Sequence, residues 1–176
     1  NQHMRLKDLD ELTKLALPYF VKAGYYKDEN LSEKEYAKLK RIVEISREGA
    51  HTLKEIPEIA SIYFEDEFEL PVVEEGMNKK ERKSVEKLRS SLETEIGKKS
   101  IELFIEKLNK FGEEITEEEA KTLLHELQDE LGEGPAAVIM PLRAVITGKA
   151  RGADLYTVIA VIGKERTLKR IHNIIK

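Results

Sequence analysis

Apolar residues recur every three or four positions along most of the chain, which is the spacing of one face of an α-helix. The first stretch of this kind holds Leu6, Leu9, Leu12, Leu15 and Ala16. Pro18 follows it. Because proline lacks a backbone donor and restricts the residue before it, we expect this helix to end or kink before Gly24.

Capping boxes mark the start of the next two helices. In this motif a Ser or Thr hydroxyl accepts a hydrogen bond from the backbone three residues on, while a Glu at that position reaches back. Ser32 with Glu35 predicts a helix that Gly49 breaks. Thr52 with Glu55 predicts the helix that follows.

The helical period is lost between residues 65 and 76, a run of acidic and apolar residues that includes Pro71. We place a domain boundary in this run and expect one domain over residues 1–70 and a second over residues 71–176. The period returns over 79–92 and 100–110, with a break expected near Gly97.

Further signals place the helices of the second domain. Thr116 with Glu119 is another capping box, and its helix is expected to end at Gly132. Pro135 stands where the first residue of a helix belongs, and Gly148 stands where the C-cap of that helix belongs.

The last part of the chain predicts two more helical segments. Asp154 is placed to cap a helix over 155–162, and Gly163 separates it from a basic helix with Leu168 and Ile171 on one face. The sequence contains no alternating strand pattern and no internal repeat. It therefore predicts an all-α fold, with two small helical bundles in tandem.

Composition narrows the class of protein. The chain has no Cys and no Trp, and 36% of its 176 residues are charged while 40% are hydrophobic, which excludes both a disordered chain and a membrane protein. Without cysteine there is no disulfide, thiolate nucleophile or Cys-ligated zinc. The apolar runs are far shorter than the roughly 20 residues that span a bilayer, and the first residues lack the apolar part of a signal peptide. We expect a packed cytoplasmic protein.

Charge is unevenly distributed along the chain. From Gly134 onward there are eight basic and two acidic residues, whereas the whole chain carries a net charge of -4. An acidic body with a basic end is typical of a protein that meets a polyanion at one end. A basic helix that merely faces solvent would give the same pattern.

Catalytic motifs are not evident. The sequence has no Gly-x-Ser-x-Gly elbow, and Lys98 and Lys99 lack the upstream glycine and strand of a phosphate-binding loop. The acidic runs at 65–69 and 117–119 are interpreted as solvated faces or as N-terminal helix charge. The residues alone predict no catalytic residue, no metal site and no independent enzyme.

The stretch from Met140 to Leu155 is the strongest candidate for a binding site. It places Arg143 in a helix that ends at Gly148 and continues into a loop of small and basic residues. Such a loop suits single-stranded RNA, whose splayed bases accept hydrogen bonds and whose phosphates attract Arg and Lys. The alternative is that Arg143 pairs with an acidic neighbour and the loop only connects two helices.

This stretch also carries a resemblance to a known family. The string Pro141-Leu142-Arg143-Ala144-x-x-Thr147-Gly148, then Leu155, then Ile162-Gly163-Lys164-Glu165-Arg166, closely resembles the C-terminal end of bacterial glutamyl-tRNA synthetases. Leu17-Pro18-Tyr19 and the run from Thr52 to Pro57 also match the family in order and spacing, so the resemblance covers the whole chain.

The resemblance implies a function for this segment and for a longer parent. The segment would be the pair of helical domains that bind the anticodon, and the parent would be a class I ligase that uses ATP and Mg in its catalytic domain. The HIGH-like and KMSKS-like motifs of that domain do not occur here. The segment would therefore need no cofactor and would bind tRNA(Glu) as a monomer without activating glutamate.

Roles are implied only at matching positions. Arg143 matches an arginine that reaches an anticodon base, and Leu155 matches a leucine that packs on the first anticodon base. The loop from Lys149 to Asp154 matches a stretch whose backbone meets the same base, although Gly152 and Ala153 replace the Thr-Pro of some members. The candidate tRNA-binding residues are Arg47, Gly49, Arg143, Thr147, Gly148, Lys149, Arg151, Gly152 and Leu155.

One departure from the family concerns specificity. Some members specific for tRNA(Glu) carry an arginine that selects cytosine at the third anticodon base, and this sequence has Gly49 there. We therefore expect the parent to accept tRNA(Gln) as well. We also expect the Arg47 to His51 turn and the Arg143 to Leu155 stretch to meet RNA along one edge. The competing hypothesis is a helical protein-interaction module with a basic C-terminal tail.

Overall fold

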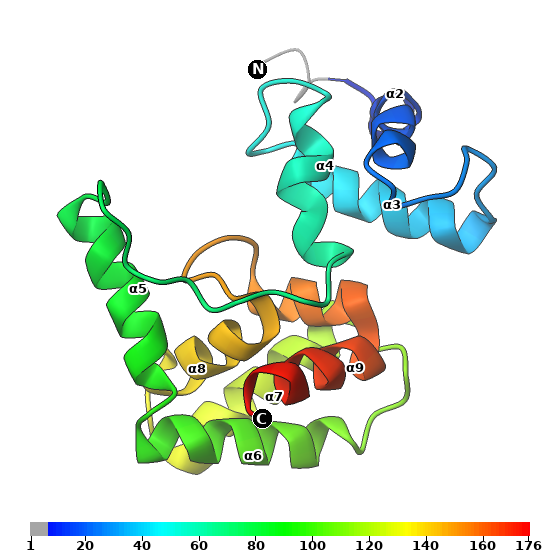
Figure 1. The fold of residues 1–176 in the computed structure, drawn as a ribbon. Helices are drawn as coiled ribbons and strands as arrows, with labels where there is room; N and C mark the ends of the chain where they lie inside the picture. The colour runs from blue at the N-terminus through cyan, green and yellow to red at the C-terminus, as the bar shows by residue number, and fades with distance from the viewer. Residues whose placement is uncertain (1–6) are drawn as a thin grey trace. The chain divides into compact units, whose positions relative to one another are not determined.

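The computed structural model describes residues 7–176, and within this range the chain is helical with no strand (Figure 1). It divides into two compact units, one up to Glu65 and one from Asp66 to Lys176. The all-α fold expected from the sequence is thus confirmed for the described residues. Each unit is described by itself below.

The first unit contains the helices α2, Leu9–Lys22, α3, Glu33–Ser46, and α4, Glu55–Ile59, followed by the 3-10 turn η1, Ala60–Tyr63. Helix α2 continues through Pro18 to Lys22, so the helix is not interrupted at the proline. Leu17 and Phe20 on either side of it are buried, and their packing offsets the lost backbone hydrogen bond. The capping box of Ser32 with Glu35 is formed as expected.

Thr52 does not cap a helix, which corrects the sequence-based expectation. Helix α4 begins three residues later, at Glu55, whose carboxylate accepts hydrogen bonds from the His51 N–H at 2.8 Å and the Thr52 hydroxyl at 3.0 Å. The reason is Pro57, which has no N–H to donate to the Leu53 carbonyl in a helix starting after Thr52. A start at Glu55 puts Pro57 in the first turn, where no donor is needed.

The second unit contains α5, Lys79–Ser91, α6, Glu95–Leu108, α7, Glu117–Leu131, α8, Pro135–Thr147, and α9, Leu155–Ile174. Helix α8 packs against each of the other four. Its buried residues are apolar over most of its length and include Leu142, Val145 and Ile146. The capping box of Thr116 with Glu119, the C-caps at Gly132 and Gly148, and Pro135 at the start of α8 are formed as expected.

Gly97 does not break a helix, contrary to expectation. The break lies at residues 92–94, and Gly97 is inside α6, where its N–H donates to the capping hydroxyl of Thr94 at 2.9 Å. A Cβ added to Gly97 would lie 1.9 Å from the Ser91 carbonyl oxygen. The glycine therefore lets the end of α5 approach the first turn of α6.

The break expected at Gly163 is present. Gly163 has φ 83° and ψ 172° inside α9, so the helix stops and restarts there. The restart is capped by Glu113 from the loop between α6 and α7. Its carbonyl accepts from the Lys164 N–H at 3.1 Å, and its carboxylate accepts from the Glu165 N–H at 3.1 Å. Asp154 stands at the N-cap of α9 but accepts from the Tyr156 hydroxyl instead of capping with its side chain.

Candidate nucleic-acid interface

The loop between α8 and α9, residues 148–154, is tied to the end of α8 by two side chains. Both terminal nitrogens of Arg143 donate to the Ala153 carbonyl, one of them at 3.0 Å. The Thr147 hydroxyl donates to the Arg143 carbonyl at 2.8 Å and accepts from the Lys149 N–H at 3.1 Å. Hydrogen bonds at both ends thus connect the loop to α8.

Two buried residues, Gly148 and Leu155, lie at the two ends of the loop. Gly148 is buried in the left-handed region with φ 63°, and a Cβ there would lie 2.5 Å from the Phe68 ring. Leu155 is only 4% exposed, so most of its side chain packs within the unit. The close approach of Phe68 explains why a glycine ends α8, beyond the requirement of the C-cap.

The outer side of the loop is cationic. Lys149, Arg151 and Gly152 are exposed, and neither basic side chain makes an ion pair within residues 7–176. Lys121 of α7 lies over the Tyr156 ring, 5.8 Å from its centroid. The loop therefore offers backbone groups and positive charges to solvent, which suits a partner with phosphates and splayed bases.

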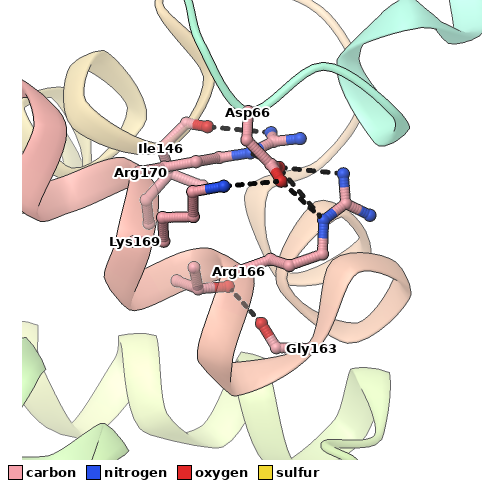
Figure 2. A network of polar contacts seen from close by, with 7 residues as sticks. Asp66, Ile146, Gly163, Arg166, Lys169 and Arg170 are labelled. Atoms are coloured by element: carbon pink, nitrogen blue, oxygen red, sulfur yellow. Dashed lines mark hydrogen bonds and ion pairs between the residues drawn. The ribbon is translucent and has the colours of Figure 1, made fainter.

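An ion-pair network supports the base of this loop (Figure 2). Asp66 accepts hydrogen bonds from Arg166 at 2.8 Å and from Arg170 Nε at 3.0 Å, and Lys169 lies 3.9 Å away. Arg170 is fully buried and also donates to the Ile146 carbonyl at 3.1 Å. The network thus joins α9 to the last turn of α8 and to the segment that begins at Asp66.

The charge state of Asp66 follows from these partners. Burial by itself raises the pKa of this carboxyl, but hydrogen bonds from Arg166 and Arg170 outweigh burial and hold the pKa below its ordinary value of 3.8. Asp66 is therefore ionised at neutral pH, and it balances a guanidinium that has no access to water.

Sequence reasoning missed this support. Asp66 lies in the acidic run that was interpreted as a solvated face, and that interpretation is wrong for this residue, whose side chain is 18% exposed. The available signal was the four-residue spacing of Arg166 and Arg170, which puts both guanidinium groups on one helix face. Their partner is about 100 residues away and could not be chosen from spacing.

The candidate residues of the first unit lie at the end of α3. Arg47 is its C-cap, so the helix already ends before Gly49. Gly49 is exposed, its φ is not positive, and an added Cβ would come no closer than 3.5 Å to Ile59. The helix thus ends just before Gly49, where the break was expected, although this glycine is not its C-cap, and a side chain fits at this position.

Other classes of site receive no support in the described part of the chain. No group of three or more His, Cys, Asp or Glu among residues 7–176 could hold a metal ion. Over the same residues no helix has the length and apolarity needed to cross a membrane.

A helical unit that presents a cationic loop is typical of an RNA-binding domain. Residues 11–175 match the family model of the anticodon binding domain, and the chain belongs to this family. It is 59% identical to a glutamate–tRNA ligase of Fusobacterium nucleatum over 100% of this chain and 35% of that protein. It is 37% identical to glutamate–tRNA ligase 1 of Caldicellulosiruptor saccharolyticus over 97% of this chain and 32% of that protein.

A solved structure shares the fold. A glutamate tRNA ligase from Elizabethkingia meningosepticum superposes with a TM-score of 0.65 and 23% identity, over 98% of this chain and 30% of that one. The chain thus spans about a third of the length of the relatives it matches.

Proposed function

We propose that this chain is the tRNA anticodon-binding region of a glutamate–tRNA ligase. The match of the whole chain to a glutamate–tRNA ligase at 59% identity carries the proposal. The parent would join glutamate to tRNA(Glu) with ATP and Mg held by its catalytic part, and would act in the cytoplasm as a monomer. The family match does not favour a protein-interaction module.

The exposed groups of the loop between α8 and α9 support this function. Lys149 and Arg151 are exposed and would meet phosphates, while the backbone around Gly152 is open to a base, with no atom within 4 Å of an added Cβ. Arg143 holds the loop through the Ala153 carbonyl. In this proposal its guanidinium edge also faces the anticodon, so Arg143 acts both as a positioning residue and in base recognition.

Arg143→Ala is the test of this role. The substitution removes the bond to Ala153 and any base contact, so we expect tRNA(Glu) binding to weaken by about 1–3 kcal/mol, with a relaxed preference at one anticodon position. Lys149→Ala is the matched variant and should weaken all tRNAs alike. Fluorescence anisotropy with tRNA(Glu) and anticodon-substituted tRNAs measures both effects. If both variants weaken the binding of all tRNAs equally, Arg143 only holds the loop and does not contact a base.

We also propose that the parent accepts tRNA(Gln). The anticodons of the two tRNAs end in cytosine and guanine, and selection between these bases requires a side chain that favours one and excludes the other. Gly49 has no such side chain, so the larger purine meets no obstacle from this residue. Arg47, two residues earlier at the end of α3, is a second candidate contact for the same base.

Gly49→Arg should create a preference for tRNA(Glu). The site is exposed and its φ is compatible with a side chain, so the variant should fold normally. An arginine there can donate to cytosine and crowd guanine, and we expect a preference of about tenfold, equivalent to about 1.4 kcal/mol. Aminoacylation of both tRNAs by the full-length parent measures it. A wild-type parent that already rejects tRNA(Gln) by about a hundredfold would contradict the proposal.

A further inference from the structure

Helix α5 is strongly cationic, although it belongs to the acidic part of the chain. Its sequence, KKERKSVEKLRSS, has six basic and two acidic residues. All six are exposed; Arg89 is used in the fold, and the other five are Lys79, Lys80, Arg82, Lys83 and Lys87. We call these five the α5 cationic face. The first 133 residues together carry a net negative charge, so the positive charge of this helix is not evident from the total.

These five cations are not neutralised inside the protein. None of them makes an ion pair or a side-chain hydrogen bond within residues 7–176. The sixth cation, Arg89, donates to the Pro71 carbonyl at 3.2 Å and is used in the fold. Of the two acidic residues, Glu81 accepts from the Asn78 N–H at 2.9 Å as part of the capping box, which leaves Glu86 as the other carboxylate of the helix.

The geometry of the helix aligns the lysines. Lys79, Lys83 and Lys87 are four residues apart, so they share one side of α5 and cover about 12 Å along it. The opposite side carries Val85 and Leu88, which are buried. The helix therefore turns a row of long, flexible ammonium groups to solvent and keeps its apolar side in the core.

The α5 cationic face belongs to the same structural unit as the loop between α8 and α9. Helix α5 packs against α8, whose end carries that loop. The extended segment after Asp66 links the two places, because Phe68 lies against Gly148 and the Pro71 carbonyl is held by Arg89 (Figure 1). The position of α5 relative to the loop is thus set by direct contacts.

We infer that the α5 cationic face binds the phosphate backbone of the RNA whose anticodon meets the loop between α8 and α9. This inference rests on the proposed function, since it assigns to that RNA a second contact. A row of unpaired lysines fits a chain of regularly spaced phosphates and carries no base-reading group, so this surface adds affinity and orientation without sequence preference. An acidic protein is the competing partner, but the place of α5 in the same structural unit as the candidate anticodon-binding loop favours RNA.

The experiment compares a triple and a double charge removal in the full chain. Lys79→Gln/Lys83→Gln/Lys87→Gln removes the central row, and Lys99→Gln/Lys110→Gln removes one charge from α6 and one from the turn that follows it, as the control. We expect the α5 variant to bind every tRNA about tenfold or more weakly at 0.1 M salt, and to lose about 2–3 from the slope of log K against log salt. Its ratio of affinities for tRNA(Glu) and a non-cognate tRNA should equal that of the wild type. The control should stay close to the wild type.

The outcomes separate this inference from the proposed function. An unchanged affinity and salt slope in the α5 variant would overturn the inference, even if the wild type still selects by anticodon. A wild type without anticodon preference whose tRNA binding still falls in the α5 variant would refute the proposed function and support the inference. Equal losses per lysine removed in the α5 and α6 variants, or polyglutamate binding as tight as tRNA binding, would also overturn the inference.

A reciprocal variant excludes misfolding as the cause. Glu86 is exposed on α5, one helical turn from Arg82 and from Lys83. Glu86→Gln removes a repulsive charge, so we expect tRNA affinity to rise about two- to threefold, whereas Glu102→Gln on α6 should change it little. A gain of affinity cannot come from unfolding. A loss in Glu86→Gln would contradict the inference.

Discussion

Asp66→Ala is expected to lower the free energy of unfolding of the second unit by about 3 kcal/mol, near the low end of the cost of breaking a buried ion pair. Arg170 is fully buried, and the substitution removes Asp66 Oδ1, which lies 3.0 Å from its Nε, while the bond to the Ile146 carbonyl remains. A guanidinium cannot lose its proton, so the charge stays in the core. Native-state hydrogen exchange of the α8 and α9 amides measures the loss.

Glu106→Ala is the control for this variant. It removes the ion pair between Glu106 of α6 and Lys110 just after this helix, and both side chains are more than half exposed. Because solvent screens such a pair, its removal should change stability far less than Asp66→Ala does. Equal effects of the two substitutions would show that the Asp66 network contributes no more than a surface pair.

Because the Asp66 carboxylate has a lowered pKa, the stability of the second unit should depend on pH. The folded state holds the pKa of Asp66 below its ordinary value of 3.8. Its contribution is therefore complete above that value and is lost as the pH falls through the lowered pKa. The free energy of unfolding should fall more steeply below pH 4 in the wild type than in Asp66→Asn. Parallel curves would contradict this assignment.

Gly97→Ala is expected to destabilise the second unit by a similar amount, about 3 kcal/mol, the upper end of the usual cost of overpacking. The added Cβ would lie 1.9 Å from the Ser91 carbonyl oxygen and 2.8 Å from the Thr94 hydroxyl. The first of these is backbone, so relief requires α5 and α6 to move apart. Hydrogen exchange of the α5 and α6 amides reports the change.

Gly112→Ala is the matched control. Gly112 lies in the loop after α6, its φ is not positive, and an added Cβ would have no neighbour within 4 Å. Alanine there should leave stability unchanged or raise it by about 0.4–1 kcal/mol, because it restricts the unfolded chain. A Gly97→Ala variant as stable as Gly112→Ala would show that the two helices adjust to the methyl group at no cost.

Helix starts and stops were largely determined by the sequence itself. The capping boxes of Ser32 and Thr116 and the C-cap of Gly148 are present as expected, since each depends on residues within a few positions of one another. The family was also indicated by ordered local motifs. Where a local signal failed, another local residue explains it, as Pro57 does for Thr52.

Only the tertiary structure decided what supports the candidate RNA-binding loop. The partner of Arg170 is Asp66, the cap of the restarted α9 is Glu113, and the atom that Gly97 accommodates belongs to Ser91. Arg143, for which an acidic partner was one alternative, donates to the Ala153 carbonyl. The sequence shows that a buried charge needs a partner, but the packing of α8 and α9 determines which residue that partner is. Contacts between distant residues depend on how the helices pack and not on spacing along the chain.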